Sequence, residues 1–211
     1  LHLLKGEASL DEVLIRVMDN LILIPGESGS EILNYSDSAI FAQFMKEAEV
    51  LNDLDVLIID TGAGISKNTQ LFLQAADDVI IVTVPDPAAI TDAYATVKVA
   101  ARERNDMLIV INQVANEQEA VTIFDRIHRV ALANIRIDLD LRFLGKINAD
   151  QKVSNAVKRR ALFSQTHPTS VPSCDIRAIA RELVKKVERQ VYVKPKESGL
   201  AGLMRRLCEQ F

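Results

Sequence analysis

The segment VLIIDTGAG, at residues 56–64, carries the strongest chemical signal in the sequence. An aspartate at the tip of a buried strand is costly unless it meets a cation or hydrogen-bond donors. In nucleotide-hydrolysing proteins, an aspartate in that position holds magnesium directly or through water. Gly62 and Gly64 would let backbone N–H groups approach a phosphate closely. The structural alternative is that Asp60 only caps the turn after its strand.

A parallel sheet would position these residues. Continuous apolar runs predict strands at residues 21–25, 56–60, 78–85, 107–112 and 141–147, because both faces of a parallel sheet are covered. Helical spacing separates them at residues 9–18, 32–51, 66–76, 88–104 and 117–133, and in a later helix capped by Ser173. The alternation predicts an α/β, mainly parallel, doubly wound sheet with flanking helices. Ligands of such folds bind at the carboxyl ends of the strands.

Composition excludes several classes of protein. The 211 residues are 48% hydrophobic and 26% charged, which is typical of a packed globular protein. Two cysteines are too few for a disulfide scaffold. The net charge of -4 argues against a specific nucleic-acid binder. No apolar run approaches the roughly 20 residues that span a bilayer. The low cysteine content favours a reducing, cytoplasmic setting.

DTGAGIS, followed by VTVPDPAAITDAY, resembles the MinD/ParA family of P-loop ATPases, and within it the FlhG (FleN) flagellar-number regulators. The resemblance implies an N-terminally incomplete ATPase domain at residues 1–193, in a family whose complete members take ATP or ADP with magnesium. Asp60 would contact the magnesium through water and act as the catalytic residue that couples hydrolysis to conformational change. Four residues would form the nucleotide-sensing switch II: Thr61, Gly62, Ala63 and Gly64.

The resemblance also implies base-binding and partner residues. Asn112 would bind the adenine edge, since an amide offers a donor and an acceptor side by side. Asn148 and Asp150 would lie in the loop that covers the base. Three residues would face a second subunit and its partners: Asp86, Thr91 and Asp92. The structural alternatives are a turn residue for Asn112 and an ordinary exposed helix start for these three.

A phosphate cradle of the form GxxxxGK[ST] does not occur in these 211 residues. The family places its cradle and first strand ahead of the position of Leu1. We therefore expect no ATP hydrolysis by this polypeptide, because no lysine and loop amides neutralise the triphosphate. In this fold the first strand lies in the middle of the sheet, so its absence would leave unpaired backbone on both neighbouring strands.

The C-terminal residues 200–211 predict an amphipathic helix after a linker at residues 194–199. The apolar positions recur at helical spacing, with two arginines off the stripe: Leu200, Leu203, Met204, Leu207, Cys208 and Phe211, with Arg205 and Arg206. Such a helix can lie on an anionic membrane, or it can pack on its own domain or in a dimer. The family implies the membrane, at the inner face of the cell, and a homodimer.

The resemblance thus implies a dimerising, membrane-associating regulator of flagellum number or placement. The resemblance implies an FlhF-like GTPase or a flagellar basal-body or regulatory protein as partner, inner-membrane lipids as the surface, and no specific nucleic acid. Two alternatives stay open, a nucleotide-independent scaffold and a ParA-like DNA-partition ATPase.

Overall fold

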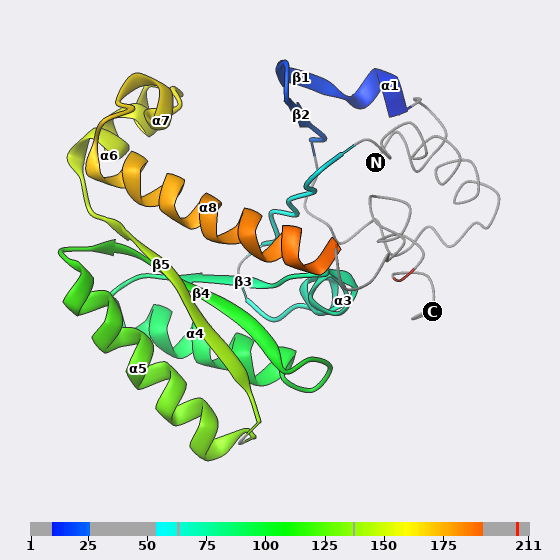
Figure 1. Cartoon of the computed structure of the whole chain (residues 1–211), viewed down its shortest axis with the longest axis vertical. Helices are drawn as coiled ribbons and strands as arrows, with labels where there is room; N and C mark the ends of the chain where they lie inside the picture. Colours follow the sequence, from blue (N-terminus) through cyan, green and yellow to red (C-terminus); the bar gives the residue numbers. More distant parts are fainter. Residues whose placement is uncertain (1–9, 26–53, 63, 137, 192–205, 207–211) are drawn as a thin grey trace. The chain divides into compact units, whose positions relative to one another are not determined.

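The computed structural model describes residues 10–25, 54–62, 64–136, 138–191 and 206 (Figure 1). The chain forms two compact units, residues 1–76 with 195–211, and residues 77–194. The expected helix at residues 32–51 and the linker at residues 194–199 lie outside the described residues. The expected C-terminal helix does too, apart from Arg206.

The second unit is built on a parallel sheet of β3 (Ile80–Thr83), β4 (Asp106–Val114) and β5 (Asp140–Asn148), in that order. Ile81 pairs with Ile109 across β3 and β4, and Val110 pairs with Gly145 across β4 and β5. Residues 107–111 of β4 are all buried, as a continuous apolar run predicts for a central parallel strand. The three expected strands and the α/β class are therefore confirmed.

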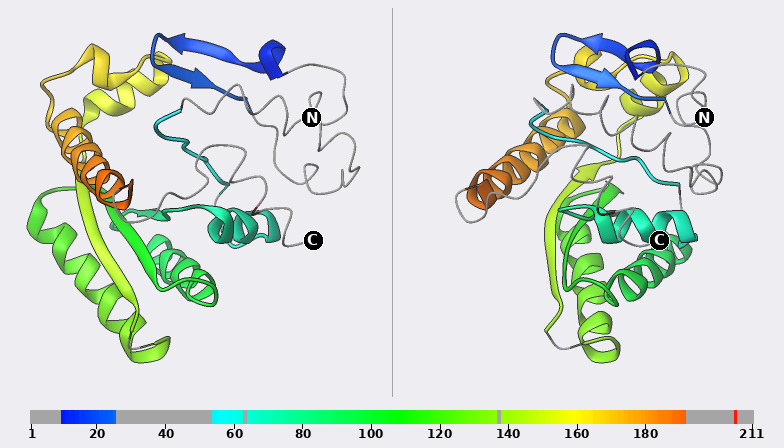
Figure 2. Two further views of the ribbon diagram at one scale, coloured as in Figure 1. Left: turned by 45° about the vertical axis from the view of Figure 1, so that its right-hand side comes forward. Right: turned by 90° about the vertical axis from the view of Figure 1, so that its right-hand side faces the viewer.

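Helices cover both faces of this sheet. α4 (Pro87–Ala100) and α5 (Glu117–Asn134) lie on one face, and α8 (Val171–Val191) crosses β5 on the other (Figures 1 and 2). Side chains at 2% exposure or less form the centre of the core: Val97, Met107, Ile109, Ile111, Val114 and Ile127. Asn116 starts α5 by accepting a hydrogen bond from the backbone N–H of Glu119, which satisfies one of the free donors of the first turn.

The end of β5 leads into two short helices that periodicity did not predict, α6 (Gln151–Lys158) and α7 (Phe163–Thr166). The start expected for the following helix was wrong. α8 begins at Val171, and the Ser173 hydroxyl lies inside it and donates to the His167 carbonyl at 2.8 Å. Ser173 therefore ties the preceding loop to the helix and does not cap it.

The first unit contains α1 (Leu10–Val13), a hairpin of β1 (Ile15–Met18) and β2 (Leu21–Leu23), and α3 (Lys67–Ala75). α3 begins where the helix at residues 66–76 was expected, and Ser66 caps it by accepting from the Thr69 N–H. The helix expected at residues 9–18 is wrong beyond residue 13. Ile15 and Val17 also alternate, and the two-residue turn that follows allows antiparallel pairing with β2.

The strand expected at residues 56–60 is also wrong, because this segment makes no strand ladder and Ile58 is 84% exposed. A continuous apolar run predicts burial but does not specify a partner strand, and none of the described strands pairs with it. β3 is likewise an edge strand in the part of the chain that the structure describes.

Candidate functional site

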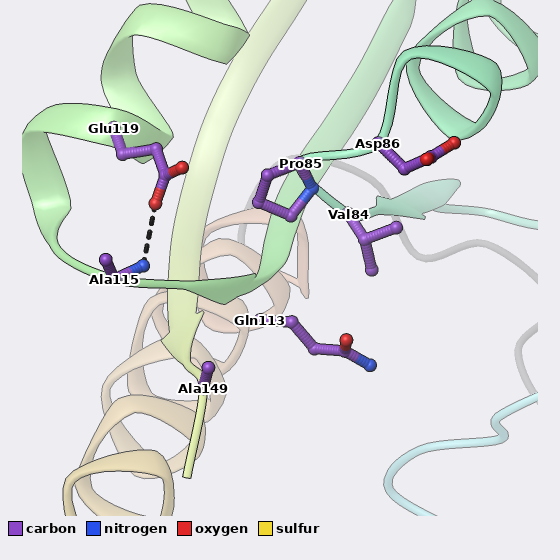
Figure 3. Close-up of a pocket in the computed structure, with 7 residues that line it drawn as sticks. All are labelled: Val84, Pro85, Asp86, Gln113, Ala115, Glu119 and Ala149. Carbon is purple, nitrogen blue, oxygen red and sulfur yellow. Dashed lines mark hydrogen bonds between the residues drawn. The ribbon is translucent and has the colours of Figure 1, made fainter.

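A cavity of about 370 Å³ lies at the carboxyl ends of the three parallel strands (Figure 3). Its lining comes from the segment after β3, from the end of β4 and the start of α5 with the loop between them, and from the residue after β5: Val84, Pro85, Asp86, Gln113, Ala115, Glu119 and Ala149. This is the sheet edge at which ligands of doubly wound folds bind.

Asn112 lies at this edge near the end of β4. Its side-chain Oδ1 accepts a hydrogen bond from the Gln113 N–H at 2.9 Å. Its Nδ2 has no partner among the described residues, so a donor is left for a ligand. Gln113 has φ 59, an uncommon conformation for a residue with a side chain. Gln113, the next residue in the sequence, lines the cavity. Hydrophobic periodicity did not identify it as a site residue.

Glu119 fixes the loop that forms one wall of the cavity. Its carboxylate accepts from the Ala115 N–H at 2.7 Å (Figure 3), while its own N–H donates to the Asn116 side chain. Glutamate three residues after a helix-capping asparagine is a capping pattern that the sequence contains. That pattern could have identified Glu119 as the residue that orders this loop.

A polar network holds Asn148 at the end of β5. Lys146 Nζ lies 2.8 Å from Asp175 Oδ1, with side-chain exposures of 18% and 12%. Lys146 also donates to the Asn148 Oδ1, and the Asn148 N–H donates to Asp175 Oδ2 at 2.9 Å. Asn148 Nδ2 then donates to the Ala115 carbonyl at 2.7 Å. Both ends of this amide are engaged within the protein, and sequence reasoning missed Asp175.

The other expected residues of this unit make local contacts. Asp86 caps α4 by accepting from the N–H groups of Ala88 and Ala89. Asp150 caps α6 by accepting from the Lys152 N–H. The Thr91 hydroxyl donates to the Pro87 carbonyl at 2.8 Å, and Asp92 is exposed on the same helix. Asp86 alone among them lines the cavity.

The switch II residues belong to the first unit. Asp60, Thr61, Gly62 and Gly64 are exposed, and the Asp60 carboxylate has no partner among the described residues. Gly64 has φ +91, a conformation that strongly favours glycine. Ala63 lies outside the described residues. Within the described ranges, no cluster of three or more His, Cys, Asp or Glu side chains could hold a metal ion.

Arg206 is the one residue of the C-terminal segment that the structure describes. Its Nε donates to the Ala75 carbonyl at 2.7 Å, at the last residue of α3. A cation there is favourable because the final carbonyls of a helix carry partial negative charge. The other expected membrane residues lie outside the described part of the chain: Leu200, Leu203, Met204, Arg205, Leu207 and Phe211. None of the described helices is both long and apolar enough to cross a bilayer.

Comparison with known proteins identifies the family. The ParA model, described as NUBPL iron-transfer P-loop NTPase, matches residues 32–184. Flagellum site-determining protein YlxH of Helicobacter pylori is 42% identical over 210 residues, 99% of this chain and 71% of that protein. Antiactivator FleN of Pseudomonas aeruginosa is 27% identical over 183 residues, 85% of this chain and 65% of FleN.

Solved structures agree on the fold. The cell division ATPase MinD of Pyrococcus furiosus matches with a TM-score of 0.64 at 18% identity, over 88% of this chain and 74% of that one. MinD of Pyrococcus horikoshii, solved with Mg-ADP, matches with a TM-score of 0.63 at 18% identity, over 88% and 72%. The family model and the 42% identity together make this chain a member of the ParA/MinD family of P-loop NTPases.

Proposed function

We propose that this chain belongs to a MinD-like regulator of flagellum number or placement, which dimerises with ATP and magnesium. The observation that carries the proposal is the 42% identity, over 99% of the chain, to a relative named for determining the flagellum site. The second relative is named an antiactivator, which also describes a regulator.

In the proposed protein, Asn112 binds the adenine edge at the carboxyl end of β4. Its Nδ2, which none of the described residues contacts by a hydrogen bond, fits this role, and its Oδ1 would have to be shared with the Gln113 N–H. Asn148 and Asp150 shape the loop that covers the base, through the contacts described above. The Asn112 amide therefore offers a purine edge its Nδ2 donor, while its acceptor oxygen is already engaged by the Gln113 N–H.

Asp60 contacts magnesium through water, and residues 61–64 respond to the terminal phosphate. In nucleotide switches of this kind, the terminal phosphate and magnesium hold the switch segment in place, and hydrolysis of that phosphate releases the segment. The Asp60 carboxylate is exposed and has no partner among the residues that the structure describes, which supports this role because it is open to an external cation. Because the 211 residues hold no GxxxxGK[ST] motif, we propose that this polypeptide alone does not hydrolyse ATP. Steady phosphate release by the purified chain would refute that.

A surface around α4, with Asp86, Thr91 and Asp92, is proposed to face the second subunit and its partners. Those partners would be an FlhF-like GTPase or a flagellar basal-body protein. Residues 200–211 are proposed to bind the inner face of the cell membrane. The contact of Arg206 with the end of α3 supports the alternative that this segment docks on its own unit.

A second candidate is a nucleotide-independent scaffold. It is favoured by the amide of Asn148 and the carboxylates of Asp86 and Asp150, which are all engaged in local hydrogen bonds. In the scaffold reading, partner binding would not change when ATP or ADP is added.

The test is the number of flagella per cell in the organism that encodes the chain. Deleting the gene should change flagellum number or placement, and the native gene should restore both. Asp60→Asn should fail to restore them, whereas Asp55→Asn, an exposed aspartate nearby, should succeed. Unchanged flagellation after deletion would refute the function. Restoration by the Asp60 variant would favour the scaffold.

A further inference from the structure

Charge is segregated along the second unit. Residues 151–174 contain no aspartate or glutamate, in a chain that has 29 acidic residues and a net charge of -4. The same stretch holds four cations: Lys152, Lys158, Arg159 and Arg160. All four are exposed, and none forms an ion pair within the described residues. The stretch contains α6, α7 and the start of α8, so the charged side chains between Asp150 and Asp175 are all basic.

Exposed aliphatic side chains flank three of these cations. Val157 is 66% exposed and Leu162 is 50% exposed, on either side of Lys158, Arg159 and Arg160. We define residues 157–162 as the basic turn. Single exposed apolar residues are normal on protein surfaces. Here two of them bracket a run of cations for which the described part of the chain supplies no ion-pair partner, so the turn presents apolar and cationic groups together.

The backbone holds the basic turn in a defined conformation. The Arg159 N–H donates to the Asn155 and Ala156 carbonyls, and the Ala161 N–H donates back to the Ala156 carbonyl at 3.0 Å. Arg160 has φ 53, at the place where glycine usually ends a helix. α6 packs against α7 and α7 against α8, and this corner lies beyond the carboxyl end of β5 (Figures 1 and 2). The turn is therefore anchored at both ends.

We propose that the basic turn is a binding site for an anionic lipid surface. Cations near such a surface gain electrostatic attraction, and exposed aliphatic side chains gain by entering the headgroup boundary. Duplex DNA would use the cations but not Val157 and Leu162, because its backbone offers phosphates and no apolar layer. Weak single membrane signals become stable in pairs, so the turn would add to the contact proposed for residues 200–211.

The experiment uses the full chain and phosphatidylcholine vesicles with and without phosphatidylglycerol, separated by sedimentation. The test variant is K158Q/R159Q/R160Q. The matched control is K98Q/R126Q/R129Q, which removes the same charge from exposed positions on α4 and α5. A further variant, V157S, removes an exposed apolar group at constant charge. Circular dichroism verifies that each variant is folded.

We expect the native chain to bind the anionic vesicles and to lose binding at high salt. Each cation at an anionic surface contributes roughly 5-fold, so the test variant should bind about 100-fold more weakly. The control should bind about 5-fold more weakly at most, and V157S should lower binding at every salt concentration.

Three results would overturn the proposal. The first is equal binding by the test variant and the control. The second is no vesicle binding by the native chain. The third is duplex DNA binding, followed by anisotropy, that depends on these three cations while vesicle binding does not. The variant L203E/L207E separates the two membrane proposals. If it abolishes binding while the test variant does not, the C-terminal segment is the contact and the basic turn is not.

Discussion

The ion pair between Lys146 and Asp175 should dominate the stability of the sheet edge that carries Asn148. The perturbation is Asp175→Ala, which removes the partner of Lys146 and the acceptor of the Asn148 N–H. Breaking a buried ion pair from one side costs about 3–5 kcal/mol, because the other charge stays buried and unpaired. The two side chains keep 18% and 12% exposure, so solvent screens part of this. We expect a loss of roughly 2–4 kcal/mol.

The assay is urea unfolding followed by circular dichroism, with hydrogen exchange of the β4 and β5 amides as a probe confined to the second unit. The matched control is Asp138→Asn, in a pair whose Nε–Oδ1 distance is 2.7 Å but whose side chains are 39% and 59% exposed. An exposed pair contributes little to stability, because water and salt screen the two charges. The double variant K146M/D175L should lose less than Asp175→Ala, since no charge is left buried.

The result that would refute this reasoning is a loss at Asp175→Ala no larger than that at Asp138→Asn. Equal losses would mean that Lys146 is solvated in the folded chain. They would also mean that Asn148 is held by its bond to the Ala115 carbonyl alone.

Two further predictions concern packing and titration. Gly145→Ala should destabilise the second unit by about 1–3 kcal/mol, because an added Cβ would lie 2.7 Å from Ile179 Cγ1. The double variant G145A/I179A should lose less than the sum of the single variants, and strict additivity would contradict the close approach of β5 and α8. The pKa of Asp138 should lie below that of an ordinary aspartate, because the Arg136 guanidinium donates a hydrogen bond to its carboxylate and attracts it. The small stabilisation from this pair should be present above the ordinary aspartate pKa and disappear as the pH falls through the lowered value. In an NMR titration, Arg136→Ala should raise that pKa, and an unchanged value would rule out the contact.

The second unit was predicted in most of its elements because local signals specify them. The runs at β3, β4 and β5 are continuously apolar, and α4 and α5 start at Asp86 and Asn116, whose side chains accept from the first turns. Each of these signals lies within one segment of the chain. Their spatial arrangement then follows from the rules for parallel sheets.

The secondary structure of the first unit was harder to predict, because it depends on which segments pair as strands. Val17 fits a helix face with Val13 and Leu14 and also a strand face with Ile15. The turn before β2 decides between the two. The apolar residues 56–60 lack a strand partner among the described residues, which their composition could not reveal.

The sequence predicted the position of the candidate site at the strand ends, but not the residues that hold those strand ends in place. Asn112 lies at the expected edge of the sheet. The residues that hold the edge were missed because Lys146 and Asp175 are 29 positions apart and meet only when α8 packs on β5. Glu119, four positions from Ala115, had a local signal that could have been used.

The proposal that an adenine base binds beside Asn112 is tested most directly by a titration of the isotope-labelled chain with Mg-ADP in two-dimensional NMR. The predicted result is saturable movement of the Asn112 side-chain amide and the Gln113 N–H, with little change at Asp106 and Asp140 at the opposite ends of β4 and β5. Asn112→Ala should remove the response, while Asn134→Ala at the end of α5 should preserve it. A response that survives Asn112→Ala, or one centred away from this edge, would contradict the proposal.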